Sequence, residues 1–92
     1  MPRVEYEIPI LTVLRHHGGR AASREVVAEV GEIVKPKLTP KDVELLSSGV
    51  VRWENRVHFT RLRLIERGLL KKDSPRGVWE ISDKGDALVK ES

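Results

Sequence analysis

Apolar residues recur at helical spacing along most of this chain, in stretches separated by glycine and proline. Residues 9–17 predict a first helix, which begins at Pro9 and ends at Gly18-Gly19. Residues 23–35 predict a second helix, which Ser23 caps and Pro36 terminates. The positions expected to face the core in these two helices are Ile10, Leu11, Leu14, Val26, Val27, Val30, Ile33 and Val34.

The segments on either side of the first helix have an extended pattern. Val4, Tyr6 and Ile8 alternate with two glutamates, which predicts that the first residues lie extended against the body of the protein. Residues 20–22, Arg-Ala-Ala, predict a short strand that caps a later hairpin.

A start signal for a third helix lies at residues 39–42. Thr39 suits the cap, Pro40 suits the first helical position, and Asp42 is placed to reach back to the cap. The apolar residues that follow are soon interrupted by Ser47-Ser48-Gly49, so this third helix is expected to be short.

The longest uninterrupted stretch, Trp53 to Arg67, predicts a helix of about four turns. Gly68 suits the left-handed conformation that ends a helix, and Leu69 is placed to pack back on the last turn. Helical periodicity assigns one narrow arc of this helix to the core, namely Trp53, Val57, Thr60 and Leu64. A second apolar arc, expected to meet neighbouring helices, consists of Leu62 and Ile65. The opposite arc is polar and basic and holds Asn55, Arg56, Phe59, Arg63, Glu66 and Arg67.

Residues 69–72 and 78–81 are short β-rich runs joined by a turn-forming segment, residues 73–77, and predict a hairpin. Trp79 and Ile81 share one face of its second strand and are assigned to the core. A last helix follows, for which Ser82 is the expected cap and whose expected core residues are Ala87, Leu88 and Val89.

This order of elements predicts a mainly α fold with a small β-hairpin. The architecture is a winged helix-turn-helix with a short extra helix before the recognition helix. Residues 1–92 are expected to form a single domain of this kind.

Positive charge is concentrated in the long helix and the hairpin. Residues 1–48 carry seven basic and seven acidic side chains, whereas residues 49–79 carry eight basic and three acidic ones, a net charge of +5. A solvated basic surface is a common explanation of such a bias. Its location on a helix followed by a hairpin favours contact with nucleic-acid phosphates.

Other chemistries find little support in the composition. The chain has no cysteine, which excludes a disulfide framework, a thiolate zinc site and a cysteine nucleophile. His16 and His17 point in different directions from a helix and have no partner at ligand spacing, so neither a metal nor another cofactor is expected. No apolar run approaches the length of a membrane span and the signal-peptide pattern is absent, so we expect a cytoplasmic protein without a membrane partner.

The long helix and the hairpin also carry a run of residues that occurs in a known family. These residues are Asn55, Arg56, Val57, Phe59, Thr60, Arg61, Leu64, Gly68, Leu69, Arg76, Gly77, Ile81, Ser82 and Gly85. In this run the chain resembles the amino-terminal domain of Mrr-type restriction endonucleases, although Phe59 and Thr60 replace a more frequent Trp and Ala. The resemblance implies a winged-helix DNA-binding module, usually joined to a nuclease domain that destroys modified DNA. It makes methylated duplex DNA the expected ligand class.

The basic arc of the long helix supplies the candidate contacts to DNA. Arginine can place two donors on guanine or clamp a phosphate, and asparagine can pair with adenine. Because the early turns of a recognition helix usually reach the bases, the expected base contacts are Asn55, Arg56 and Phe59. The expected phosphate contacts are Ser48, Arg52, Arg63 and Arg67. The expected wing contacts, to phosphates or to a narrow minor groove, are Lys71, Lys72 and Arg76.

Several of these residues have a second interpretation. Phe59 either presents its ring to a methyl group in the major groove or packs against Leu45, Leu46 and Val50, and packing is favoured because aromatic side chains in small domains usually belong to the core. Ser48 either binds a phosphate at the start of the long helix or only turns the chain. His58 lies off the basic arc and is expected to be structural or a rim contact.

The leading hypothesis is therefore a duplex DNA-binding domain that is selective for base sequence or for base modification, with methylated bases as the modification that the resemblance implies. One alternative is a small winged-helix transcription regulator that reads an unmodified operator. Another is a protein-interaction winged helix whose basic face meets an acidic partner. The chain is not expected to be an enzyme. A metal-dependent nuclease of this family needs clustered carboxylates and a lysine, and no Asp or Glu here is followed two residues later by Lys in a strand-like segment. Any nuclease activity would reside in a fused domain outside this sequence.

Overall fold

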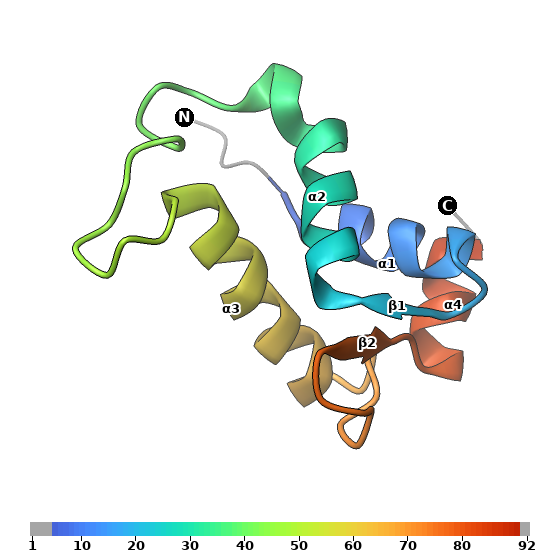
Figure 1. Cartoon of the computed structure of the whole chain (residues 1–92). Coiled ribbons are helices and arrows are strands. Elements are labelled where there is room, and N and C mark those ends of the chain that lie inside the picture. Colours follow the sequence, from blue (N-terminus) through green and yellow to red (C-terminus); the bar gives the residue numbers. More distant parts are fainter. Residues whose placement is uncertain (1–4, 91–92) are drawn as a thin grey trace.

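A computed structural model describes residues 5–90 as a mainly helical domain with a small antiparallel sheet (Figure 1). Its elements in chain order are α1 (Glu7–His16), β1 (Arg20–Ala22), α2 (Ser23–Val34), the 3-10 helix η1 (Lys35–Lys37), α3 (Arg52–Glu66), β2 (Val78–Glu80) and α4 (Asp83–Lys90). The mainly α architecture with a small sheet confirms the predicted winged-helix class.

The core lies where α1, α2 and α3 meet. The largest fully buried side chains all come from these helices and are Ile10, Leu11, Leu14, Val26, Val30, Val34, Val57 and Leu64. The core faces predicted for the first two helices are thus confirmed, except at Ile33, which is exposed in the last turn of α2. Ser23 is the first residue of α2 rather than its cap, and Ala22 precedes the helix in an extended conformation.

Helix α1 begins earlier than the sequence pattern predicts. The Glu5 carboxylate accepts a hydrogen bond from the backbone N–H of Glu7 at 2.6 Å and others from that of Ile8, and so caps the free donors of the first turn. The extended conformation expected up to Ile8 was therefore wrong at Glu7 and Ile8, which are helical, and at Tyr6, whose φ of −112° and ψ of −14° are not extended. Tyr6 is buried against the core, and Val4 lies outside the described residues.

The short extra helix expected before α3 does not form. Asp42 does reach back, since its Oδ2 accepts hydrogen bonds from the Thr39 N–H at 2.9 Å and the Thr39 hydroxyl at 3.0 Å. The chain nevertheless makes only turns at residues 40–43. The carbonyl groups of Asp42 and Glu44, which a continuing helix would use, instead accept hydrogen bonds from the N–H groups at the start of α3. Residues 38–51 are consequently a long loop (Figure 1).

The sheet pairs the strand after α1 with the strand before α4. Strands β1 and β2 run antiparallel with Ala21 opposite Trp79, which confirms the strand predicted at residues 20–22. The other half of the predicted hairpin is reduced to a bridge between Leu70 and Ile81. The strand expected at residues 69–72 is shortened because Leu70 still takes part in closing the end of α3. Its N–H donates to the Leu64 carbonyl at 3.3 Å.

The end of α3 and the start of α4 follow the prediction. Gly68 has a φ of 76°, the left-handed conformation that few other residues adopt, and Leu69 is buried behind it. The Ser82 hydroxyl caps α4 by accepting a hydrogen bond from the Gly85 N–H at 3.1 Å. The core face predicted for α4 was largely wrong. Val89 packs partly against the core, but Leu88 and Ala87 are exposed, and Gly85 is the buried residue.

Candidate nucleic-acid interface

Helix α3 buries one side and presents the other to solvent. Val57 and Leu64 are fully buried, Trp53 packs partly against the core, and Thr60 is half-buried, as predicted for this arc. The place of Trp53 depends on Gly31 of α2, because a Cβ at that position would lie only 2.6 Å from the indole ring. Gly31 therefore makes room for α3.

The polar arc of α3 faces solvent as predicted, with Arg56, Arg63 and Glu66 exposed and Asn55 half-buried. Phe59 lies in the middle of this arc and is 59% exposed. The favoured prediction that Phe59 packs against residues 45–50 was therefore wrong. Those residues belong to the loop that replaces the expected helix, and Leu45 is itself 69% exposed.

Leu62 also belongs to the exposed arc, contrary to its predicted place against neighbouring helices. Its side chain is 49% exposed, whereas Ile65 of the same predicted arc does pack partly against the core. The sequence contained a signal for this position. Leu62 follows Asn55 by seven residues, which is close to two helical turns, so the two side chains lie on nearly the same line along α3.

The middle of the exposed arc borders a hollow beside the start of α1. Its volume is about 250 Å³, and its lining residues are Glu5, Tyr6, Glu7, Arg56, Phe59, Thr60 and Arg63. The buried Tyr6 hydroxyl has no hydrogen-bond partner in the described part of the chain. Burial raises the pKa of Tyr6 and the nearby Asp42 carboxylate adds to the effect, so this phenol stays protonated. The pKa of Asp42 is lowered, mainly by the Thr39 N–H that donates to it.

The amino terminus of α3 is less open to a phosphate than predicted. The N–H groups of Arg52 and Trp53 each donate to a loop carbonyl at 2.9 Å, so two of the free donors of this helix end are already engaged. Ser48 is exposed in a tight turn in which the Gly49 N–H donates to the Leu46 carbonyl. Contact with a phosphate at this end would therefore depend on the side chains of Ser48 and Arg52.

Two of the predicted basic contacts have carboxylate partners. Arg67 forms an ion pair with Glu7 of α1. Lys71 Nζ lies 2.8 Å from a Glu80 carboxylate oxygen, and this hydrogen bond raises the pKa of Lys71. Lys72 and Arg76 are exposed on the turn before β2 and have no ion pair among residues 5–90.

The sequence interpretation missed two contacts that join α3 to the sheet. The Arg61 guanidinium carbon lies 5.4 Å from the ring centroid of Trp79. The His58 ring meets the same indole edge to face, with 5.6 Å between the two ring centroids. Trp79 is buried, as predicted. Both contacts hold α3 against β2 and so fix the exposed arc relative to the turn at residues 72–77.

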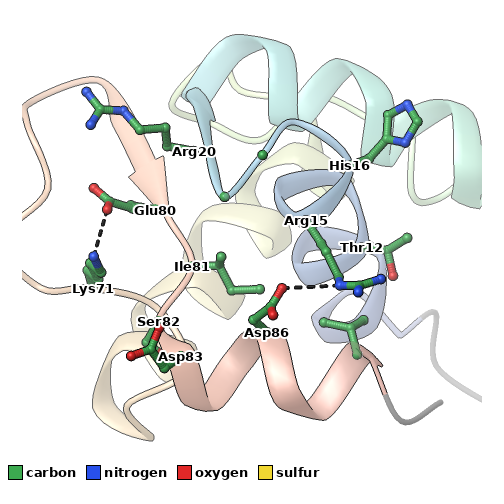
Figure 2. Close-up of a pocket in the computed structure, with 13 residues that line it drawn as sticks. Thr12, Arg15, His16, Arg20, Lys71, Glu80, Ile81, Ser82, Asp83 and Asp86 are labelled. Atoms are coloured by element: carbon green, nitrogen blue, oxygen red, sulfur yellow. Dashed lines mark hydrogen bonds and ion pairs between the residues drawn. The ribbon is translucent and has the colours of Figure 1, made fainter.

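A larger hollow, of about 960 Å³, lies between α1, β2 and the start of α4 (Figure 2). Its charged side chains largely neutralise one another. Arg15 pairs with Asp86 at 3.2 Å, and Lys71 pairs with Glu80. This balance of charge makes the hollow a weaker candidate for a polyanion than the exposed arc of α3.

Over residues 5–90, no group of three or more His, Asp or Glu side chains is placed to hold a metal ion. The helices in this range are also too short or too polar to span a membrane.

A family model described as the Mrr N-terminal domain matches residues 4–91, nearly the whole sequence. Searches of curated proteins and of solved structures gave no significant match.

Proposed function

The chain belongs to the Mrr N-terminal domain family, and from this membership we propose that it binds duplex DNA with α3 in the major groove. The observation that carries the proposal is the two-sided character of α3. One side is anchored in the core by Val57 and Leu64, and the other presents Arg56, Phe59 and Arg63 to solvent. A rigid helix with an exposed basic face meets the requirements of groove binding.

The exposed residues divide into two roles by position. We assign Asn55, Arg56 and Phe59, in the first two turns, to base edges. Arg63 and the wing residues Lys72 and Arg76 are the cations best placed to neutralise phosphates, because they carry no ion pair within residues 5–90. The remaining proposed backbone contacts are Ser48, Arg52, Arg67 and Lys71. Arg67 and Lys71 would have to share or release their carboxylates.

Duplex binding should depend steeply on salt, and a double variant tests the assigned phosphates. Arg63→Ala with Arg76→Ala should weaken binding to all duplex sequences alike. It should also flatten the slope of log affinity against log salt by about 1.8, since each lost phosphate contact contributes about 0.9. Fluorescence polarisation of labelled duplexes between about 50 and 200 mM salt measures both quantities.

A charge-matched control distinguishes this interface from a general effect of net charge. Arg15→Ala with Lys90→Ala removes the same charge from α1 and α4, and it should leave the salt slope nearly unchanged. Equal losses in the two double variants, or full affinity in the first, would exclude the proposed face. Binding of an acidic protein in place of DNA would favour the protein-interaction alternative.

We further propose that the domain favours methylated DNA and that a nuclease activity, where present, belongs to a fused domain. The exposed ring of Phe59 lies between polar side chains that can hold a base, and a buried methyl group contributes about 1 kcal/mol. Matched duplex pools that differ only in adenine or cytosine methylation should therefore differ in affinity by about fivefold. Phe59→Ala should remove this preference while circular dichroism shows a folded protein. Equal binding of the wild-type domain to all pools would favour a regulator that reads an unmodified operator.

A further inference from the structure

Phe59 and Leu62 form an exposed apolar pair on the solvent-facing side of α3. Their side chains are 59% and 49% exposed. They lie three residues apart, so they are neighbours on the helix surface. The residues around them on the same side of α3 are Asn55, Arg56, Arg63 and Glu66. A single exposed leucine needs no explanation, but two adjacent large apolar side chains within a polar rim are a candidate contact surface.

We propose that this apolar pair reads C5-methyl groups on two neighbouring base pairs, and that Leu62 is a specificity-determining residue. The inference rests on the proposed function, because it requires α3 to lie in the major groove. The C5-methyl group of thymine is the apolar feature that unmodified base pairs present there. A 5-methylcytosine presents the same group at the equivalent position, so the ligand chemistry is a pyrimidine C5-methyl from either source.

The spacing of the pair matches the spacing of bases. Three residues of α-helix advance about 4.5 Å along the axis, and successive bases on one strand lie about 3.4 Å apart. Each side chain can therefore meet its own base pair. Leu62 extends base reading into the third turn of α3, where only backbone contacts were expected.

Charge identifies DNA as the occupant of this surface. Residues 49–79 carry a net charge of +5, and Arg56 and Arg63 beside Phe59 are both exposed, so the surface around the pair suits a polyanion. The loop at residues 38–51 also exposes Val43 and Leu45. Nothing in the structure indicates what covers that second patch, so it carries no comparable inference.

The test begins with selection of a preferred site from random unmodified duplexes by the wild-type domain. The selected sites should contain two adjacent base pairs with thymine, on either strand. Replacing one thymine with deoxyuridine removes its methyl group and leaves its hydrogen-bonding groups unchanged. Each replacement should lower the affinity about fivefold, and both together about 25-fold. In a second experiment, either base pair is replaced with one that contains cytosine or 5-methylcytosine. The difference in affinity between these two duplexes measures the same methyl contact from the second source.

Variants then assign each methyl group to a side chain. Leu62→Ala should abolish the uracil effect at one of the two positions and preserve it at the other, and Phe59→Ala should do the converse. Leu88→Ala, an exposed leucine on α4 that is 42% accessible, is the matched control and should preserve both effects. Circular dichroism and thermal melting establish that each variant is folded.

The possible failures are distinct. A wild-type domain that binds no duplex would overturn the proposed function itself. Salt-dependent duplex binding without a uracil effect would overturn only the apolar pair. A uracil effect that persists at both positions in Leu62→Ala would exclude Leu62.

Discussion

Leu64→Ala should lower the free energy of unfolding by about 2–5 kcal/mol. Leu64 is fully buried, and its carbonyl group accepts hydrogen bonds from the N–H groups of Leu69 and Leu70, so it anchors both α3 and the junction that follows. A small domain has few other side chains that can move into the cavity. Chemical denaturation monitored by circular dichroism measures the effect, with the denaturant midpoint expected to fall at an unchanged slope.

Leu62→Ala is the matched control. It removes the same atoms as Leu64→Ala, two residues earlier in α3, but from a side chain that is half exposed. Its effect on unfolding should stay within about 0.5 kcal/mol. Together the two variants determine the rotation of α3 in solution. A stable Leu64→Ala combined with a destabilised Leu62→Ala would mean that the other side of the helix is buried. The proposed DNA-binding face would then be wrong as well.

Sequence periodicity was most informative where one helix packs against another. The buried residues of α1 and α2 and the buried line from Val57 to Leu64 follow from spacing alone, because a helix in a small domain must bury one apolar side. Gly68 also identified the end of α3, since its positive φ suits glycine for a reason local to the turn. The basic, exposed character of the opposite arc followed from the same periodicity.

Periodicity failed in the segment before α3 because the decisive contacts are distant in sequence. The local signal at Thr39 and Asp42 was interpreted correctly as a side-chain contact, and that contact exists. It was extended incorrectly into a helix. A first helical turn is costly to form, and the carbonyl groups that would have continued it bind the N–H groups of Arg52 and Trp53 instead.

The sequence predicted which side of α3 is exposed and basic, but not which side chains lie opposite its residues. A helical wheel gives the direction of each side chain and not what lies opposite. It therefore placed Phe59 under a helix that does not form and Leu62 against neighbours that do not reach it. The ion pairs of Arg67 with Glu7 and of Lys71 with Glu80 also depend on the tertiary fold. These pairings now favour Arg63, Lys72 and Arg76 as the freer cations.

The junction between α3, the sheet and α4 is closely packed around Gly85. The Ser82 hydroxyl donates to the Gly68 carbonyl at 2.5 Å, and the Ser82 N–H donates to the Leu69 carbonyl at 3.1 Å. A Cβ on Gly85 would lie 2.2 Å from the same Leu69 carbonyl oxygen and 2.9 Å from the Ile81 side chain. The nearest obstacle is backbone, which cannot rotate away as a side chain can. Gly85 is therefore required for the close approach of α4 to the end of α3.

Gly85→Ala should destabilise the domain by about 1–3 kcal/mol. The sign of this change in stability is diagnostic, because alanine in place of glycine within a helix ordinarily stabilises the helix by about 1 kcal/mol. Ala87→Gly, on the exposed side of the same helix, measures that propensity alone and should cost about 1 kcal/mol.

The clash at Gly85 should also displace the Leu69 carbonyl. Leu69 lies in the segment that joins α3 to the turn at residues 72–77, so the position of α3 relative to that turn should change. DNA affinity of the folded Gly85→Ala protein should therefore fall, while that of Ala87→Gly should not. A Gly85→Ala domain that is as stable as the wild type, by denaturant unfolding, would show that α4 does not pack this closely.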